Sequence, residues 1–325
     1  MDSRTLYIRR LPQLRRALLR WYDDNQRDLP WRGTRDPYGI WVSEIMLQQT
    51  RVAAVLPRYG KFLRRFPSVE KLASARLSSV LAEWSGLGYY RRARNLHAAA
   101  RVITRELAGS FPTHSDQWRK LPGIGRYTAS AIASIAFNEP IAVLDGNVER
   151  VLRRLLHCST AADSWNAAQQ LLDRERPGDF NQAMMELGAT ICVPGEPSCA
   201  RCPIRTFCGT RGRGQSQSRK ARQIKASISI ALATKGGSVL LVQRGVRESL
   251  MSGMWELPTL NHSISNEEVL FRVRHSITVT DYVVSVIARS EVNTESGRWI
   301  SRRKVHKLPL TGLTKKILRK ANLIK

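Results

Sequence analysis

The chain has 325 residues, 42% of them hydrophobic and 24% charged, which suffices for about two globular domains with cores of their own. Its 53 Lys and Arg residues against 26 Asp and Glu residues give a formal net charge of +27, and this surplus predicts a polyanionic partner, either nucleic acid or a membrane surface. Because no apolar run approaches the ~20 residues of a membrane-spanning helix and the N-terminus lacks a signal-peptide pattern, we expect no membrane association and a cytoplasmic location.

Residues 1–209 carry helical periodicity almost throughout. Leucines in the first twenty residues are spaced for an amphipathic helix. Further stripes run through two later segments, at Ile45, Met46, Gln49, Val52 and Leu56 and then at Leu72, Leu77, Val80 and Leu81. The alternation of polar and apolar residues that marks a β-strand is hard to find here, so the pattern predicts an all-α first domain.

One acidic residue of this region lies on an apolar helix face. In IWVSEIMLQQT (40–50), Glu44 meets Ile40 and Trp41 one turn before it and Leu47 one turn after it. A surface glutamate does not have three apolar neighbours on its own face. We therefore expect desolvation to raise the pKa of Glu44 and to keep a proton on it near neutrality.

A glycine turn precedes a run of small residues in LPGIGRYTASAIAS (121–134). Gly123 and Gly125 permit positive φ and leave backbone N–H groups uncovered, and the helix that follows presents its positive dipole end. Such a turn binds a phosphate well, whereas a tight structural loop before a closely packed helix explains the same letters. The net charge of +27 favours the phosphate interpretation.

A second carboxylate follows at the end of an apolar run. Asp145, in IAVLDGNVERVLRRL (141–155), precedes Gly146, Asn147 and a new helix, so a helix N-cap is its simplest role. A dry acid such as Glu44 together with a fixed carboxylate also meets the needs of N-glycosidic bond cleavage. The acid protonates the leaving base, and the anion stabilises an oxocarbenium-like sugar.

Four cysteines are crowded into 17 residues, CVPGEPSCARCPIRTFC, with the spacing C-x6-C-x2-C-x5-C, at Cys192, Cys199, Cys202 and Cys208. Disulfides are one explanation, but in a cytoplasmic chain this crowding indicates a metal or cluster site. Zinc prefers paired knuckles, and the irregular spacing around a single C-x2-C fits an iron–sulfur cluster better. Cys158, in an apolar helical context, is expected to be a buried bystander.

The composition changes after the cysteines. Residues 210–225 contain six basic residues and no acidic ones around a Gly/Ser/Gln core, which is typical of a linker. Beyond it, ASISIALAT and SVLLVQR flank Lys235-Gly236-Gly237 as the arms of a hairpin, and ITVTDYVVSVIA is a further strand region. SNEEVLFRVR looks helical, and TGLTKKILRKA is a basic helix. We therefore expect two domains, 1–209 and 226–325, the second a small α/β unit.

These motifs together resemble the helix-hairpin-helix DNA glycosylases, and specifically the MutY-type adenine DNA glycosylases. The likeness runs nearly the full chain, through LPWR (29–32), WVSEIMLQQT (41–50), GLGYYRRARNLH (86–97), LPGIGRYTASA (121–131), LDGNVERVL (144–152), the cysteine loop and a C-terminal region similar to a Nudix domain. It implies an all-helical catalytic half with a 4Fe-4S cluster loop, then a Nudix-like domain. The implied partner is double-stranded DNA in which adenine, mispaired with 8-oxoguanine or guanine, is flipped out. We expect a monomer.

The resemblance also implies roles at the motif positions. Glu44 would be the general acid at adenine, and Asp145 would stabilise the sugar cation. Tyr127 and Asn147 would position Asp145 and the sugar, and the adenine pocket would be formed by Trp31, Arg32 and Gln182. Contacts beside the partner base would come from Gln49 and Tyr89, and phosphate contacts from Gly123 and Gly125. The cluster would be bound by Cys192, Cys199, Cys202 and Cys208. Because Gln49 also lies on the apolar stripe of its helix, a buried structural amide is its alternative role.

Tyr127 separates this chain from close relatives. Glycosylases similar to endonuclease III carry a lysine at this position, whose amine forms a Schiff base and leads to strand cleavage, and tyrosine cannot do this. We therefore expect a monofunctional enzyme. The alternatives are a thymine or uracil mismatch glycosylase, which typically lacks MLQQT, GLGYY and a second domain, and a non-catalytic cluster-containing DNA-binding protein, against which Glu44 and Asp145 argue.

The C-terminal region departs from the family in two places. Nothing after WELPT supplies the Glu-rich helix that would hold Mg²⁺ for pyrophosphate hydrolysis, so we expect a binding module. The family reads Phe-Ser-His in the loop that recognises 8-oxoguanine, whereas this chain keeps Arg274 and His275 but reads Ile277-Thr278-Val279 in that loop. Thr278 offers a hydroxyl, but Val279 lacks the imidazole. We predict a preference for 8-oxoguanine over guanine that is weaker than the family's.

Overall fold

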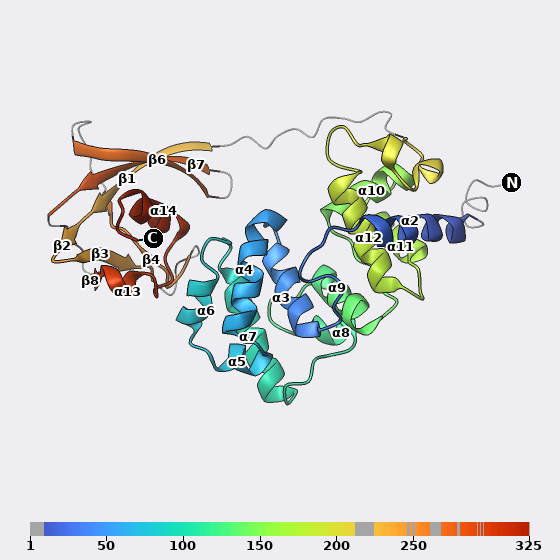
Figure 1. Ribbon diagram of the computed structural model, residues 1–325, viewed down its shortest axis with the longest axis horizontal. Helices are drawn as coiled ribbons and strands as arrows, with labels where there is room; N and C mark the ends of the chain where they lie inside the picture. Colours follow the sequence, from blue (N-terminus) through green and yellow to red (C-terminus); the bar gives the residue numbers. More distant parts are fainter. Residues whose placement is uncertain are drawn as a thin grey trace. The chain divides into compact units, whose positions relative to one another are not determined.

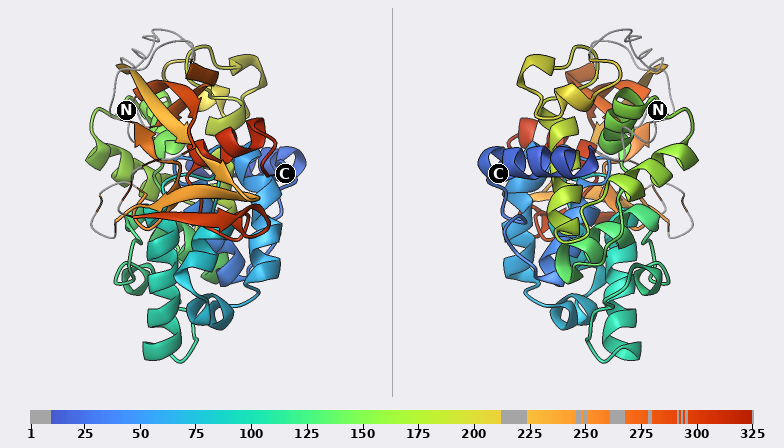
Figure 2. Two further views of the ribbon diagram at one scale, coloured as in Figure 1. Left: turned by 90° about the vertical axis from the view of Figure 1, so that its left-hand side faces the viewer. Right: turned by 90° about the vertical axis from the view of Figure 1, so that its right-hand side faces the viewer.

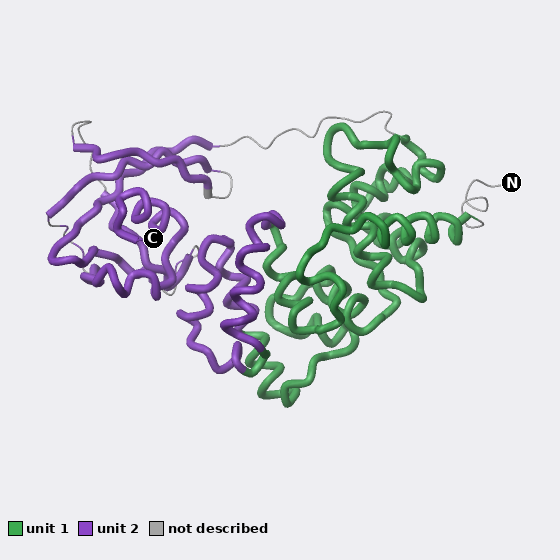
Figure 3. The backbone as a smooth tube through the Cα atoms, in the orientation of Figure 1, with its two compact units in different colours: residues 1–49, 68–70, 98–219 green, residues 50–67, 71–97, 220–325 purple. Residues whose placement is uncertain are grey.

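The computed structural model describes residues 10–211, 224–245, 248, 251–260, 268–277, 280–290, 292, 294 and 296–324 (Figures 1 and 2). The chain forms two compact units that do not follow chain order (Figure 3). The first unit contains Met1–Gln49, Ser68–Glu70 and Ala98–Arg219, and the second contains Thr50–Pro67, Lys71–His97 and Lys220–Lys325. Within the described ranges, no helix is both long enough and apolar enough to cross a bilayer.

Helices account for the regular structure from residue 10 to residue 211, and no strand occurs there, as the periodicity predicted. They are α2 (Leu11–Asn25), α3 (Pro37–Leu47), α4 (Val52–Arg65), α5 (Val69–Ser74), α6 (Leu77–Glu83), α7 (Arg91–Glu106), α8 (Ser115–Trp118), α9 (Arg126–Phe137), α10 (Gly146–Leu156), α11 (Ala161–Leu171), α12 (Pro177–Thr190) and the short 3-10 turns η1 (Cys199–Arg201) and η2 (Arg205–Phe207).

Helix α3 is buried on nearly every side. It begins after Asp36, whose carboxylate accepts hydrogen bonds from the N–H groups of Tyr38 at 3.1 Å and Gly39 at 2.8 Å, and Pro37 occupies its first position. All nine residues from Tyr38 to Met46 are buried. A helix that is apolar all round lies in the interior of a domain. The placement of α3 therefore carries Glu44 into the protein.

Helix α9 packs closely against α12 because its buried face is made of small residues. The stretch from Thr128 to Ser134 is buried throughout. On α12, a Cβ atom added to Gly178 would lie 2.6 Å from the carbonyl oxygen of Ser134, so only glycine allows this approach. The small residues of 129–134 are thus explained by helix packing.

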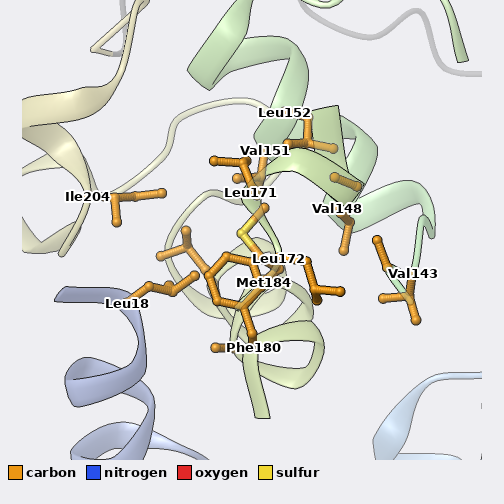
Figure 4. Packing of buried hydrophobic residues seen from close by; sticks show 14 of the residues in the cluster. Leu18, Val143, Val148, Val151, Leu152, Leu171, Leu172, Phe180, Met184 and Ile204 are labelled. Atoms are coloured by element: carbon orange, nitrogen blue, oxygen red, sulfur yellow. The ribbon is translucent and has the colours of Figure 1, made fainter. Parts of the chain in front are cut away.

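The main core of the first unit lies between α2, α10, α11 and α12. Figure 4 shows Phe180 and Met184 of α12 among leucine and valine side chains from the other helices. Tyr127 and the cysteines Cys192, Cys202 and Cys208 pack against the same cluster. One core therefore supports both Tyr127 and the cysteine loop.

The C-terminal part of the second unit consists of two four-stranded sheets. One has the order β5-β1-β7-β6, with β1 (Ile224–Leu232) parallel to β7 (Thr280–Ala288) and antiparallel to β5 (Thr259–Leu260), and β6 (Val269–Ile277) antiparallel to β7. In the other, β3 (Ser238–Gln243) pairs antiparallel with β2 (Thr234–Lys235), β4 (Trp255–Glu256) and β8 (Gly297–Ser301). The remaining helices are α13 (Arg302–Val305) and α14 (Gly312–Lys320).

The hairpin at Lys235-Gly236-Gly237 is confirmed, since β2 and β3 pair across it and both glycines have positive φ, 52° and 71°. The helix predicted in SNEEVLFRVR is wrong for residues 269–274, which form β6. Arg272 and Arg274 are exposed while Val273 is buried, a period of two that the neighbouring Glu pair concealed. The fold is thus a helical part followed by a strand-rich part.

Candidate active site and cysteine loop

Glu44 lies in the middle of α3 and is only 6% exposed. The pKa of its carboxyl is raised to about 7, and burial is the largest cause. The negative charge of Asp145 also raises this pKa, whereas a hydrogen bond with Tyr127 and the charge of Arg32 lower it. Its Oε2 atom has no hydrogen-bond partner among the described residues. The expected desolvated acid is confirmed, and a buried oxygen without a partner indicates a place for an external ligand.

Asp145 is the N-cap of α10, as its position after an apolar run suggested. Its Oδ1 accepts hydrogen bonds from the backbone N–H groups of Asn147 at 2.9 Å and Val148 at 2.7 Å, and its Oδ2 accepts one from the Asn147 side chain at 2.9 Å. Both oxygens are therefore held in place. The capping role and a role as a fixed anion use the same geometry and do not compete.

Tyr127, in the first turn of α9, interacts with Glu44 and is close enough to Asp145 to be affected by its charge. Its hydroxyl donates a hydrogen bond to the Met185 Sδ at 3.3 Å and also interacts with Glu44. Burial, together with the negative charges of Glu44 and Asp145, raises the pKa of Tyr127 well above its ordinary value. Side chains from α3, α9 and α10 thus converge within the first unit.

Glu186 of α12 is fully buried and binds two arginines. Arg27 donates to both of its oxygens, from Nε and Nη2 at 2.7 Å each, and Arg32 donates from Nη2 at 2.6 Å. Burial raises the pKa of Glu186, but these hydrogen bonds and charges outweigh burial and lower the pKa to about 2. Glu186 therefore stays ionised and fixes Arg32, whose charge acts on Glu44.

The other two residues expected in the adenine pocket lie near this network in sequence. Trp31 is buried beside Arg32, and Gln182 is half-buried on α12 one turn before Glu186. Arg32 also lies over the ring of Tyr22, 5.5 Å from its centroid. The pocket itself stays a prediction.

Gln49 and Tyr89, expected beside the partner base, both have left-handed backbones, with φ of 53° and 47°. Helix α3 ends at Leu47, and the side chain of Gln48 is held by the Thr128 hydroxyl at 3.0 Å. The continuous helical stripe through Gln49 is therefore wrong, and so is the alternative of a buried amide, because Gln49 is exposed. Thr278 lies outside the described residues, as does Val279.

The two glycines of the hairpin differ. Gly123 has a φ of +75°, as expected, but Gly125 is the N-cap of α9 with a φ of −88°, so the expected positive φ is wrong there. A Cβ atom added at Gly125 would meet nothing within 4 Å. Neither the backbone nor the packing of this chain requires glycine at 125, and the expected phosphate contact there stays a prediction.

All four cysteines of the loop line one cavity, together with Arg154, Ile191 and Arg205. None of the chain's five cysteines is in a disulfide, and Cys158 is half-buried, so the expectation that it is buried is wrong. Within the described part of the chain, no group of three or more His, Cys, Asp or Glu residues is arranged to hold a metal ion. The four thiols share this cavity, and the group that it holds stays a prediction.

Arg150 of α10 links the Asp145 end of its helix to the cysteine loop. Its Nη2 donates to the Asn147 Oδ1 at 2.8 Å and to the Gly188 carbonyl at 2.7 Å, and its Nε donates to the Cys192 carbonyl at 2.8 Å. Asn147 in turn binds Asp145. A chain of hydrogen bonds therefore runs from the first cysteine to the fixed carboxylate.

Arg154, one turn later, contacts both ends of the loop. Its Nη1 donates to the Cys192 carbonyl and Sγ, each at 3.2 Å, and to the Val193 carbonyl at 2.8 Å. Its own carbonyl accepts from the Cys208 thiol at 3.4 Å and from the Thr210 N–H at 3.1 Å. The first and last cysteines are thus held to the same residue of α10.

The sequence analysis missed Glu186, Arg27, Arg150 and Arg154. Glu186 had a weaker signal than Glu44: it stands in the apolar run AMMELGAT (183–190), but Gln182 occupies one of the positions one turn before it. The arginines had none. Their partners lie 159 residues away for Arg27 and 42 residues away for Arg150, and a single basic residue in the sequence does not predict so distant a partner.

Comparison with known proteins places these features in a family. Residues 42–175 match the family described as HhH-GPD superfamily base excision DNA repair protein. The chain is 33% identical to the adenine DNA glycosylase of Homo sapiens over 400 aligned positions, covering 94% of this chain and 73% of the human protein. It is 48% identical to the adenine DNA glycosylase of Mus musculus over 217 residues, covering 62% of this chain.

The chain spans 42% of the length of the mouse relative. Among solved structures, that of a thermostable thymine-DNA glycosylase aligns with 64% of this chain and 98% of its own length, with a TM-score of 0.59 and 29% identity. The solved structure is therefore similar to little more than the helical part of this chain.

Proposed function

Because the chain belongs to the adenine DNA glycosylase family within the HhH-GPD superfamily, we propose that it releases adenine from duplex DNA by hydrolysing the N-glycosidic bond. The observation that carries the proposal is the pairing of Glu44, a buried carboxyl with a pKa of about 7, with Asp145, a carboxylate fixed by three N–H donors. One group gives a proton and the other compensates a positive charge. Both are needed when a neutral purine leaves a sugar.

Glu44 acts first in this proposal. Near neutral pH a large fraction of its carboxyl groups carries a proton, and among the described residues Oε2 has no hydrogen-bond partner. Proton transfer to a ring nitrogen of the flipped adenine makes the base a better leaving group. Once the base has left, the Glu44 carboxylate accepts a proton from the water that attacks the sugar.

Asp145 stabilises the oxocarbenium-like sugar that forms as the bond breaks. Its oxygens do not reorganise during the step, because Asn147 and Val148 already hold them. Tyr127 has no amine, so no Schiff base forms at this position. The chain is therefore monofunctional in this proposal and leaves an abasic site without cutting the strand.

The substrate in this proposal is double-stranded DNA with adenine opposite 8-oxoguanine or guanine. Trp31, Arg32 and Gln182 line the adenine pocket, and the Glu186 carboxylate holds the cation of Arg32 there. Gln49 and Tyr89 contact the partner base. The backbone at Gly123 and the open position at Gly125 contact phosphate, which a chain with a net charge of +27 attracts.

We place a 4Fe-4S cluster in the cavity of Cys192, Cys199, Cys202 and Cys208. Four thiolates around one cavity suit such a cluster, and Arg154 donates to one of these sulfurs. The cluster would cross-link the four cysteines of the loop to one another. Arg150 and Arg154 bind that loop to α10, and Arg150 also holds Asn147. Iron and zinc analysis of the purified protein tests the assignment, and stoichiometric zinc would contradict it.

The helical part, residues 1–209, is the catalytic domain of this proposal, and residues 226–325 are a Nudix-like module that reads the partner base. With Ile277-Thr278-Val279 in the recognition loop, Thr278 supplies the hydroxyl contact. The loss of one or two other contacts costs about 1–3 kcal/mol of discrimination. The preference for 8-oxoguanine over guanine is therefore weaker than in relatives with an intact loop.

A single-turnover assay tests the proposal. Duplexes with A opposite 8-oxoguanine, A opposite G, T opposite G and U opposite G are incubated with excess protein, and free base and strand breaks are measured separately. We expect adenine release from the first two, no strand break without alkali and no adduct after borohydride treatment. Release of thymine or uracil alone would favour the mismatch-glycosylase alternative, and no release from any duplex would favour a binding protein.

A further inference from the structure

The segment between α6 and α7, in the second unit, holds three residues in left-handed conformations within four positions. Gly86, Gly88 and Tyr89 have φ angles of 94°, 69° and 47°. Glycine takes this conformation freely, but a tyrosine has a Cβ that opposes it. The ring of Tyr89 is also 48% exposed, so its own burial does not compensate the strain. Other contacts must hold this segment.

Arg92, in the first turn of α7, provides those contacts. It is only 9% exposed, and its Nη2 donates to the carbonyls of Leu87 at 3.0 Å and Gly88 at 3.1 Å and to the Thr50 hydroxyl at 2.9 Å. The Arg92 N–H donates to the Tyr89 carbonyl at 2.9 Å. One residue therefore binds three successive carbonyls of the strained segment.

Neighbouring side chains reinforce the same carbonyls. The Thr50 hydroxyl donates to the Leu87 carbonyl at 3.3 Å, and the Trp84 indole donates to the Gly88 carbonyl at 3.2 Å. The Arg92 guanidinium lies 5.5 Å from the centroid of the Trp84 ring and 5.4 Å from that of Tyr89. The segment is thus rigid on its inner side, while the Tyr89 ring remains partly open to solvent.

Burial of Arg92 has a cost that its surroundings offset only in part. Burial lowers the pKa of Arg92 to about 10, while the nearby Tyr89 raises it, so the side chain is still a cation at neutral pH. A planar guanidinium satisfies several acceptors at once, which a lysine ammonium does not do with the same geometry. The chain therefore maintains a buried cation beside an exposed aromatic residue.

We infer that Arg92 is a positioning residue: it holds Gly88 and Tyr89 in their left-handed form, so that the Tyr89 ring is presented to stack against a base when the neighbouring nucleotide leaves the DNA helix. The inference rests on the proposed function, which needs an extruded nucleotide. Exposed aromatic rings stack on bases of any sequence, and a ring fixed before binding loses less conformational freedom on binding. Arg92 then acts on base extrusion through Tyr89 and not through contact with DNA.

The test is a double-mutant cycle on the full chain. Arg92→Met keeps much of the side-chain volume and removes the guanidinium, Tyr89→Ala removes the ring, and the third protein carries both changes. A duplex with 2-aminopurine next to the target adenine reports unstacking by its fluorescence, and single-turnover adenine release is measured on the same duplexes. We expect Arg92→Met to lower duplex unstacking and adenine release about tenfold when Tyr89 is present. In the Tyr89→Ala background, Arg92→Met should cause no further loss of duplex unstacking or of adenine release.

Two further variants keep the inference open to contradiction. Arg92→Lys preserves the charge and is the substitute if Arg92→Met does not fold; it should give the same dependence on Tyr89 with a smaller loss. Arg91→Met removes a charge from the adjacent exposed position and should leave the fluorescence gain intact. Equal losses from Arg92 substitution with and without Tyr89, or no loss in either background, would overturn the inference.

The two readouts separate this inference from the proposed function. If the wild type releases no adenine but unstacks the duplex in an Arg92-dependent manner, the proposed function fails and the inference stands. If adenine is released normally by every Arg92 variant, the inference fails and the function stands.

Discussion

Two buried glutamates of the first unit, Glu44 on α3 and Glu186 on α12, have opposite electrostatic surroundings. Glu44 sits in an apolar helix, and burial raises its pKa to about 7. Glu186 is also buried, yet two arginines lower its pKa to about 2. Burial alone therefore does not decide the charge of a carboxyl group; the number of cationic donors that it meets does.

The difference also separates the tasks of the two regions. A carboxyl that keeps its proton until a substrate arrives can give that proton away. A carboxylate that binds Arg27 and Arg32 is permanently charged and can only hold other groups in place. The region around Glu44 is thus suited to chemistry, and the region around Glu186 is suited to positioning.

The largest expected effect is on base release. Glu44→Gln removes the proton donor without removing a phosphate contact, so we expect adenine release to fall by about 10²–10⁴-fold while duplex affinity changes little. Single-turnover rates and binding on an adenine–8-oxoguanine duplex measure both. Glu106→Gln, at an exposed position of α7, is the matched control and should behave as the wild type. Wild-type rates in Glu44→Gln would remove Glu44 from the mechanism.

The second effect is on stability. Glu186→Gln leaves two arginines without their carboxylate. We expect the free energy of unfolding to fall by about 2–3 kcal/mol, at or below the lower end of the usual ~3–5 kcal/mol, because Arg27 is 40% exposed. Since the pKa of Glu186 is depressed, its contribution is present above its ordinary pKa and is lost as the pH falls toward 2. Denaturant unfolding measures it. Glu149→Gln breaks an exposed pair with Arg153 and should cost about 0.5 kcal/mol or less. An equally small loss of unfolding free energy in Glu186→Gln would mean that the buried ion pairs of Glu186 contribute no more than an exposed pair.

A third effect has the opposite sign. The folded pKa of Glu44 lies above its ordinary value, so its contribution to stability is complete at low pH and is lost as the pH rises through about 7. Relative to the wild type, Glu44→Gln should therefore gain about 2 kcal/mol of unfolding free energy between about pH 5 and about pH 8.5. Denaturant titrations at the two pH values test this. A difference that does not change with pH would mean that Glu44 titrates normally.

The smallest expected effect comes from Tyr127→Phe. The Tyr127 hydroxyl lowers the pKa of Glu44, so its removal should raise that pKa further above about 7. The pH at which adenine release declines on the alkaline side should move upward in the same direction. An unchanged or lower midpoint would mean that the hydroxyl does not stabilise the charged form of Glu44.

Much of the site was predictable because its determinants are local in sequence. Glu44 stood out through apolar neighbours one turn away on either side, and Asp145 through its place between an apolar run and a helix. The four cysteines were evident from their spacing. In each case the informative residues lie within a few positions of the residue that they explain.

The remainder depends on contacts distant in sequence or on backbone angles. The two arginines that set the charge of Glu186 lie 159 and 154 residues from it. The apolar stripe continues past the end of α3, so periodicity did not predict the left-handed φ of Gln49. For β6, the Glu pair that precedes the strand concealed its period of two. Tertiary contacts decided all three.

The most direct measurement is the titration of the Glu44 carboxyl itself. A protonated carboxylic acid has an infrared carbonyl band whose intensity is followed against pH in the wild type and in Glu44→Gln. The difference between the two series isolates this one group. A midpoint near pH 7 is the predicted result, because burial opposes the charged form of Glu44. A midpoint near 4.5, the ordinary value for glutamic acid, would contradict the account, since Glu44 would then be ionised before any adenine reached it.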